Sequence, residues 1–393
     1  MILRQFLLKL HGRCNLSCSY CYVYEAADQS WRAKPRRMES PTVRQVARRI
    51  AEYRQGDEPI SVILHGGEPL LVGARHLDES LSVLRDALGD GGGEVSLWVQ
   101  TNGVLLRDAE LLRVLRRHGV RVGVSLDGTA RDHDRNRRFG DGRGSHQAVA
   151  EGLRALGSEV NRHLYAGVLC TVDLANDPVA TYEALLEFAP PRMDLLLPHG
   201  TWSAPPPGLE GREPPRTPPA QGERGTPYAD WLCAVFDRWY GAPRRETGIR
   251  LFEELIMLLL GGRAASELVG TGAMDLVVVE TDGTIELADS LKVAYDGAAA
   301  TGLNVFEDSF ADVAAHPAFS TPPRAAVCGR CALERVCGGG LYAHRYRAGA
   351  GDVFGYPTVY CHDMAALIAH IGAALRRDAA ALRARRAQEV GVR

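Results

Sequence analysis

The sequence has little net charge and no long apolar run. Its 393 residues include 46 lysines and arginines against 48 aspartates and glutamates, which gives a formal net charge of −2. This balance offers no electrostatic reason to expect nucleic acid or a membrane surface as a partner. No apolar stretch approaches a membrane span, and the first residues lack the basic, apolar and small-residue pattern of a signal peptide. We therefore expect a cytoplasmic protein that binds neither nucleic acid nor membranes.

Lysine is scarce, whereas arginine is abundant. Lysine stands only at positions 9, 34 and 292. This bias says nothing about function. Hydrophobic residues make up 46% and charged residues 24% of the chain, as in an ordinary globular protein. The length allows one large domain together with a smaller one.

Nine cysteines are present, and seven of them fall into two groups. In a cytoplasmic chain, clustered cysteines indicate metal or redox ligands rather than disulfides. Cys170 and Cys233 stand alone, and we expect each to be a small buried apolar residue. The two groups are Cys14, Cys18 and Cys21, and Cys328, Cys331, Cys337 and Cys361.

The first group follows the apolar run 6–10, with three and then two residues between its cysteines. Three thiolates on one short loop can bind three irons of a [4Fe–4S] cube and leave the fourth iron open. An open iron can chelate a small molecule and pass it an electron. The same three cysteines could instead be three ligands of a structural zinc site with a distant fourth ligand.

The first 200 residues alternate between strand and helix patterns. Such alternation implies parallel strands and right-handed crossovers. Six units are too few for a closed eightfold barrel, so we predict an open, partial (β/α)6 barrel, with chemistry at the carboxyl ends of the strands. The strands are expected at 5–11, 60–65, 94–100, 121–126, 163–172 and 193–198, and helices at about 40–51, 75–88, 108–118, 145–156 and 178–188.

The second half is less regular. Prolines and glycines at 203–226 predict a linker or a flexible loop. Helices are expected at 228–240 and 251–260, a hairpin at 276–287 around Asp282-Gly283, and a last helix at 363–387. We therefore divide the chain into five parts. These are the barrel at 1–202, the proline-rich segment at 203–226, a helical bridging region at 227–275, a small cysteine domain at 276–362 and a C-terminal helix at 363–393.

Polar motifs follow several of the predicted strands. Gly66-Gly67-Glu68-Pro69 follows the second strand, where glycines let the backbone approach a ligand closely and a carboxylate can accept an ammonium group. Ser125-Leu-Asp127-Gly128 ends the fourth strand, and Arg137 lies a few residues beyond. Arginine can bind a carboxylate through two parallel hydrogen bonds. Weaker candidates at strand ends that face the same mouth are Thr101, Asn102 and Thr171.

Together these motifs resemble the radical S-adenosylmethionine (SAM) superfamily. Its signature is CxxxCxΦC, with Tyr20 here as Φ, and GGEP is its second motif. The resemblance implies the partial barrel fold, a [4Fe–4S] cluster at Cys14, Cys18 and Cys21, and bound SAM. Arg137 could instead form a surface ion pair, because other arginines surround it. The implied cofactor-binding residues are Tyr20, Gly66, Gly67, Glu68, Thr101, Asn102, Ser125, Arg137 and Thr171.

The second cysteine group resembles part of the SPASM domain, which holds auxiliary clusters in many peptide-modifying radical SAM enzymes. The resemblance implies one auxiliary [4Fe–4S] cluster bound by Cys328, Cys331, Cys337 and Cys361. A zinc ribbon is the alternative, although five residues between Cys331 and Cys337 is an unusual spacing for one. A second auxiliary cluster would need cysteines where Ala288 and Leu341 stand, so we expect only one.

Asp289 lies next to one of these missing cysteines. In sulfatase-maturing relatives an aspartate at the matching place acts as a base, and a carboxylate beside a cluster could take a proton during substrate oxidation. We therefore predict Asp289 as a catalytic residue, with a capping or hairpin aspartate as the equally open alternative.

Longer runs resemble one subfamily, the FxsB-type radical SAM/SPASM peptide maturases that form cyclophanes. These runs are Trp31 with the residues before it, 163–171, 195–202 and 337–345. The resemblance implies a ribosomally made precursor peptide as substrate, a bond between an aromatic ring and a nearby Cβ, and an external reductant such as flavodoxin or ferredoxin. Sulfatase maturation, thioether formation and, outside enzymes, a zinc-binding scaffold are the alternatives.

Overall fold

The computed structural model describes residues 2–54, 58–89, 94–219, 225–264, 266–272, 275–320 and 323–391. It divides into two compact units. The first comprises Met1–Thr171, Ala180–His199 and Ala273–Pro322, and the second comprises Val172–Val179, Gly200–Gly272 and Pro323–Arg393. The two cysteine groups therefore lie in different units.

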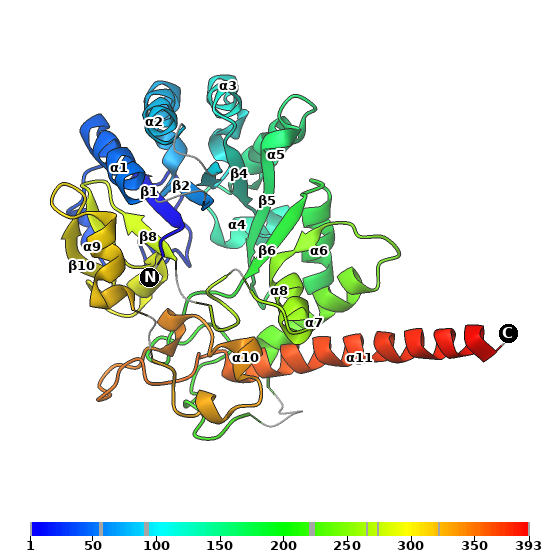
Figure 1. The fold of residues 1–393 in the computed structure, drawn as a ribbon. Helices are drawn as coiled ribbons and strands as arrows, with labels where there is room; N and C mark the ends of the chain where they lie inside the picture. The colour runs from blue at the N-terminus through cyan, green and yellow to red at the C-terminus, as the bar shows by residue number, and fades with distance from the viewer. Residues whose placement is uncertain are drawn as a thin grey trace. The chain divides into compact units, whose positions relative to one another are not determined.

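The first unit is built on parallel strands that neighbour one another in chain order, from β1 to β6. Figure 1 shows α1, α2, α3 and α5 in a row along one side of these strands. The predicted open α/β barrel is thereby confirmed. The strands are β1 Gln5–His11, β2 Ile60–Gly66, β3 Val95–Thr101, β4 Arg121–Ser125, β5 Tyr165–Thr171 and β6 Arg192–Leu196. The helices are α1 Ser40–Tyr53, α2 Gly73–Leu88, α3 Ala109–Arg117, α4 Ala130–Asn136, α5 His146–Gly157 and α6 Pro178–Leu186.

The two faces of β2 have different surroundings. Val62 and Leu64 are fully buried, whereas Ser61, Ile63 and His65 keep partial exposure. Successive side chains of a strand point to opposite faces, so one face packs under the helices and the other faces the barrel interior. His65 therefore belongs to the inner face, at the carboxyl end of its strand.

The predicted hairpin is present and extends the barrel sheet. β8 (Leu276–Val279) pairs antiparallel with β9 (Thr284–Glu286) and parallel with β1, with Gln5 opposite Leu276. β10 (Ala300–Asn304) follows beside β9 and the helix α9 (Phe310–Ala315) comes next. We expected a new domain to begin at residue 276. Pairing with β1 instead places this segment in the first unit, together with the barrel.

The second unit holds helices and irregular chain. Its elements are α7 Pro227–Tyr240, β7 Gly248–Ile249, α8 Arg250–Leu259, α10 Glu334–Cys337 and α11 Cys361–Gly391. Phe236 of α7 packs edge-on against Phe252 of α8, with ring centroids 5.3 Å apart. Residues 203–219 of the proline-rich segment are irregular, as expected, but partly packed, since Leu209 is fully buried; residues 220–224 of the predicted loop lie outside the described residues. Among the described residues, no helix is both long and apolar enough to cross a membrane.

Candidate functional site

The first three cysteines lie on the loop after β1 and line a pocket of about 1000 Å³. The ends of β2 to β6 supply the other walls, as the predicted mouth of the barrel requires. Burial raises the pKa of Cys14 to about 12 and that of Cys18 to about 11. Three thiolates in this place would therefore need cationic partners, which is the environment that a metal cluster supplies.

The turn after β2 has room only for glycines. A Cβ on Gly66 would lie 2.2 Å from the carbonyl oxygen of His11, and Gly66 has a φ of +148°. A Cβ on Gly67 would lie 1.9 Å from the Tyr24 hydroxyl and 2.6 Å from the Arg13 backbone. Both glycines line the pocket, so the backbone itself forms this part of its wall.

Glu68 is fully buried, and its carboxylate binds the end of the neighbouring strand β3. Its Oε1 accepts hydrogen bonds from the Thr101 hydroxyl at 2.7 Å and from the Leu70 N–H at 3.0 Å. Its Oε2 accepts one from the Asn102 N–H at 2.7 Å. The carboxylate thus fastens the end of β3 to the turn after β2, a role that the motif alone did not predict.

Asn102 continues this connection to the cysteine loop. Its Nδ2 donates to Asn15 Oδ1 at 2.7 Å and lies 3.6 Å from Cys14 Sγ. Thr101 and Asn102 both line the pocket, as does Ser125, whose hydroxyl accepts a hydrogen bond from Gln100 at 3.3 Å. The strand-end residues expected to share one mouth are therefore brought together there.

Arg137 is buried beside the cysteines rather than on the surface. Its Nη1 donates to the Tyr20 hydroxyl at 3.0 Å, and that hydroxyl donates to Asp127. Asp127 also accepts the Thr171 N–H at 3.0 Å. The Arg137 Nε is buried and has no hydrogen-bond partner among the residues that the structure describes. Since Arg137 lines the pocket, this orphaned donor is available to an anionic ligand.

Asp289 begins the 3-10 helix Asp289–Val293 and forms a buried ion pair with Lys9 of β1 at 2.6 Å. Lys292 lies 3.4 Å from its other oxygen. Burial alone would raise the pKa of Asp289, but the two ammonium groups outweigh burial and hold it well below its usual range. Asp289 is therefore an ionised carboxylate.

Lys292 also binds two more buried carboxylates. Its Nζ lies 2.7 Å from Glu280 and 2.9 Å from Glu286. These three acids lie close enough together to hold a metal ion, but the Lys292 ammonium already pairs with each of them. We call Lys9, Glu280, Glu286, Asp289 and Lys292 the charge cluster. Of these, only Asp289 was predicted from the sequence.

Two histidines, His65 and His199, line the same pocket; the sequence placed His199 at the mouth of the barrel, with packing as the alternative, and gave His65 no role. Burial lowers the pKa of His65 to about 4 and that of His199 to about 4, so both imidazoles are neutral at pH 7. His199 packs edge-on against Tyr22, with ring centroids 4.7 Å apart. A polar residue at the inner-face position just before the glycine turn was the signal that could have identified His65.

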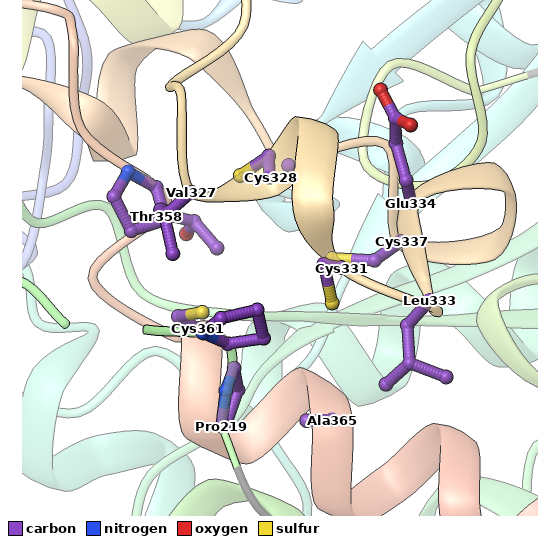
Figure 2. Close-up of a pocket in the computed structure, with 13 residues that line it drawn as sticks. Pro219, Val327, Cys328, Cys331, Leu333, Glu334, Cys337, Thr358, Cys361 and Ala365 are labelled. Carbon is purple, nitrogen blue, oxygen red and sulfur yellow. The ribbon is translucent and has the colours of Figure 1, made fainter. Parts of the chain in front are cut away.

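The second cysteine group surrounds a pocket in the second unit. Cys328 begins a 3-10 helix, Cys337 ends α10 and Cys361 begins α11. Figure 2 shows the four cysteines around one space, together with Pro219 of the proline-rich segment. Burial raises the pKa of Cys337 to about 11. The four predicted ligands are therefore brought together, in a site that again favours a cationic partner.

Comparison with known proteins gives the same assignment for the barrel. The model of the radical SAM superfamily matches residues 8–185. The serine-type anaerobic sulfatase-maturating enzyme of Klebsiella aerogenes is 34% identical over 144 residues, which cover 36% of this chain and only 34% of that enzyme. The cysteine-type enzyme of Clostridium novyi is 23% identical over 296 residues, which cover 72% of this chain and 74% of that enzyme.

Solved structures resemble the whole chain. The structure of anSMEcpe with bound AdoMet and Cp18Cys peptide matches with a TM-score of 0.75 and 20% identity, over 96% of this chain and 99% of that one. Streptococcus suis SuiB, bound to the precursor peptide SuiA, matches with a TM-score of 0.56 and 12% identity, over 92% of this chain and 76% of that one. The chain therefore has the radical SAM fold, and its residues 8–185 match the radical SAM superfamily.

Proposed function

We propose that this protein is a radical SAM enzyme that oxidises a ribosomally made precursor peptide and forms a C–C crosslink within it. The superfamily match implies SAM and a [4Fe–4S] cluster. The residues present fit both groups. The loop after β1 supplies three thiols, from Cys14, Cys18 and Cys21. A [4Fe–4S] cube has four irons, so three thiols would leave one iron open. The unpaired Nε of Arg137 suits the SAM carboxylate.

When bound, these groups supply a 5′-deoxyadenosyl radical that can remove a hydrogen atom from an unactivated C–H bond. The chain's own residues have the tasks of binding, orienting and excluding water. Tyr20 and Asp127 hold Arg137 in position, and Gly66 and Gly67 let the backbone approach the ligand. Ser125 and Thr171 line the same wall, where we expect further contacts with SAM.

The proposed bond joins the Cβ of one residue to the ring of an aromatic residue nearby, which closes a three-residue cyclophane. The peptide loses two hydrogens. One leaves as an atom to the deoxyadenosyl radical, and the other leaves as a proton together with one electron. An iron–sulfur cluster would supply a one-electron acceptor for this step, and the residues that would hold it are Cys328, Cys331, Cys337 and Cys361. This bond is proposed from the resemblance of the runs 195–202 and 337–345 to the FxsB-type maturases.

Mass spectrometry tests the proposal. The full chain is reconstituted anaerobically with iron and sulfide and reduced in the presence of SAM and a candidate phenylalanine-containing precursor. We expect 5′-deoxyadenosine together with a peptide that is lighter by two hydrogens, and loss of both with Cys14→Ala. Formation of 5′-deoxyadenosine without any peptide change would reject that precursor. Absence of an iron–sulfur cluster in the folded protein would overturn the proposal.

Sulfatase maturation is the second candidate. It is favoured by the likeness in fold to anSMEcpe over nearly the whole chain, and that structure holds a peptide. Oxidation of a serine in such a peptide to an aldehyde also removes two hydrogens, so mass alone does not separate the two reactions. A hydrazide probe does, because it reacts with an aldehyde and leaves a C–C crosslink untouched. A hydrazide adduct on the product would replace the crosslink proposal by this one.

A further inference from the structure

We propose that His65 accepts the proton that the oxidised substrate releases, and that Asp289 is the counter-ion of the imidazolium that forms. This inference rests on the proposed function and deepens it. Once the new C–C bond has formed, the ring carbon still carries its hydrogen. The C–H bond breaks, its electron pair restores the aromatic ring, the proton goes to a nitrogen of His65, and the surplus electron goes to the iron–sulfur acceptor named above. Aldehyde formation would need the same two acceptors.

The proposal is based on the position of His65 in the wall of the pocket. Its side chain lies on the inner face of β2 and lines the pocket that also contains Cys14, Cys21 and Arg137. Its Nδ1 is buried without a hydrogen-bond partner in the described part of the chain. A neutral imidazole always has one ring nitrogen with a free lone pair. His65 is thus a neutral acceptor in the wall of the pocket.

Asp289 is less suited to take the proton itself. It is not one of the residues that line the pocket, and Lys9 and Lys292 approach its carboxylate from two sides. A carboxylate neutralised by two cations is a weak proton acceptor. Lys9, which pairs with Asp289, stands opposite His65 in the pairing of β1 with β2, so we give the aspartate an indirect role as a charge near the histidine.

The charges around His65 suit an imidazolium that exists only briefly. Asp289 and Glu280 favour the charged ring, whereas burial, Lys9 and Lys292 oppose it. The charge cluster contains three carboxyl groups and two ammonium groups, so it can balance one further positive charge. The resting imidazole is neutral, with a pKa of about 4. So weak a base suffices, because the ring loses its aromaticity when the Cβ radical adds to it, and the adduct becomes a strong acid once it has given up one electron.

His199 is the competing acceptor in the pocket. Its pKa is also lowered to about 4, and Asp289 also favours its charged form. However, its ring packs edge-on against Tyr22, and it takes part in a further interaction. Within the residues that the structure describes, His65 Nδ1 has no hydrogen-bond partner, so we assign the proton to His65 and use His199 as the comparison.

An isotope-labelling experiment tests the assignment of the proton to His65. The peptide carries deuterium at the reacting Cβ, and 5′-deoxyadenosine and crosslinked peptide are both quantified. For His65→Gln we expect deuterium transfer into 5′-deoxyadenosine within about threefold of wild type, but at least about tenfold less crosslinked peptide per deoxyadenosine, since loss of a general base typically costs 10²–10⁴ in rate. The exposed His163→Gln is the control and should keep the wild-type ratio. An unchanged ratio in His65→Gln, or a fall in His199→Gln alone, overturns the inference.

A second readout does not depend on turnover. NMR titration of ¹³C-histidine-labelled full-length protein, with His65→Gln to assign the resonance, should show a neutral His65 at pH 7. Asp289→Asn should move its titration to lower pH, because the carboxylate favours the charged ring. A protonated His65 at pH 7, or no shift in Asp289→Asn, contradicts the inference. If wild type transfers no deuterium from any peptide, the proposed function fails and this titration alone decides the role of His65.

Discussion

Arg137 donates a hydrogen bond of 3.0 Å to the hydroxyl of Tyr20. Tyr20 is the aromatic position of the cysteine motif, and Arg137 lies 117 residues further along the chain. The contact joins the loop that carries the cysteines to the side chain expected to bind the SAM carboxylate. Because Tyr20 also donates to the buried Asp127, its hydroxyl fixes the guanidinium between two elements of the barrel.

The first prediction concerns this hydroxyl. Tyr20→Phe should weaken SAM binding by about tenfold, because a hydrogen bond to a charged group contributes about 1.5–3 kcal/mol. Isothermal titration calorimetry of SAM with the reconstituted, full-length protein measures the change. Iron content should stay at the wild-type level, since no cluster ligand is altered. Tyr53→Phe, which removes a hydroxyl remote from the pocket that pairs with the Leu3 N–H, is the control. Unchanged SAM affinity in Tyr20→Phe would contradict the positioning role.

The second prediction concerns the glycine turn. Gly67→Ala should abolish SAM binding or unfold the barrel, because its Cβ would lie 2.6 Å from the Arg13 backbone, which has no room to move away. Thermal unfolding and SAM titration measure both effects. Gly157→Ala is the matched control, since Gly157 ends α5 and a Cβ there would have no neighbour within 4 Å. A Gly67→Ala protein with normal SAM affinity would show that the turn is not part of the binding wall.

The third prediction concerns the second cysteine group. Cys361→Ala should lower the iron and acid-labile sulfide content by roughly four atoms each per chain, because a [4Fe–4S] cube would lose one of its four ligands. Cys233→Ala, a lone cysteine in α7, should keep the full content. Zinc without sulfide in the wild-type protein would instead favour a structural zinc site at these four residues.

The fourth prediction concerns the buried ion pair. Lys9→Met should lower the free energy of unfolding at pH 7 by less than the roughly 3–5 kcal/mol that breaking a buried ion pair usually costs, because Lys292 still lies 3.4 Å from Asp289. The exposed pair between Arg4 and Glu58, whose side chains are 45% and 51% exposed, supplies the control, and Arg4→Met should cost at most about 1 kcal/mol. Urea unfolding of both variants measures the difference.

The pH dependence of that effect has a definite sign. The folded-state pKa of Asp289 is held below its unfolded value of about 3.9, so its pairing stabilises the protein above that pH. The stabilisation is lost as the pH falls through the folded-state pKa. The difference between wild type and Lys9→Met should therefore be full at neutral pH and shrink as the pH falls from the folded-state pKa of Asp289 in the variant to that in wild type. No difference in stability at pH 7 would contradict the ion pair.

Local sequence pattern was enough to predict the barrel and its mouth. The strand Ile60–Gly66 and the turn that follows it were recognisable because alternating apolar residues and glycines carry their conformational meaning locally. The same holds for Cys14, Cys18 and Cys21, whose spacing places three thiols on one loop whatever the rest of the chain does. Parallel strands then bring their carboxyl ends together, so Thr101, Ser125 and Thr171 were expected at one edge before any contact was known.

Only the tertiary structure decided which charges meet. Lys9 and Asp289 are 280 positions apart, and they pair because β8 extends the sheet beside β1. No local pattern encodes that pairing, since burial and Coulomb energy depend on distances that folding alone creates. The same physics turns Glu68 toward the end of β3 and keeps His65 neutral at the wall of the pocket. It also leaves Arg137 Nε without a hydrogen-bond partner among the described residues. The sequence by itself determined the kinds of groups that this protein gathers, whereas the tertiary structure determined their charge states and partners.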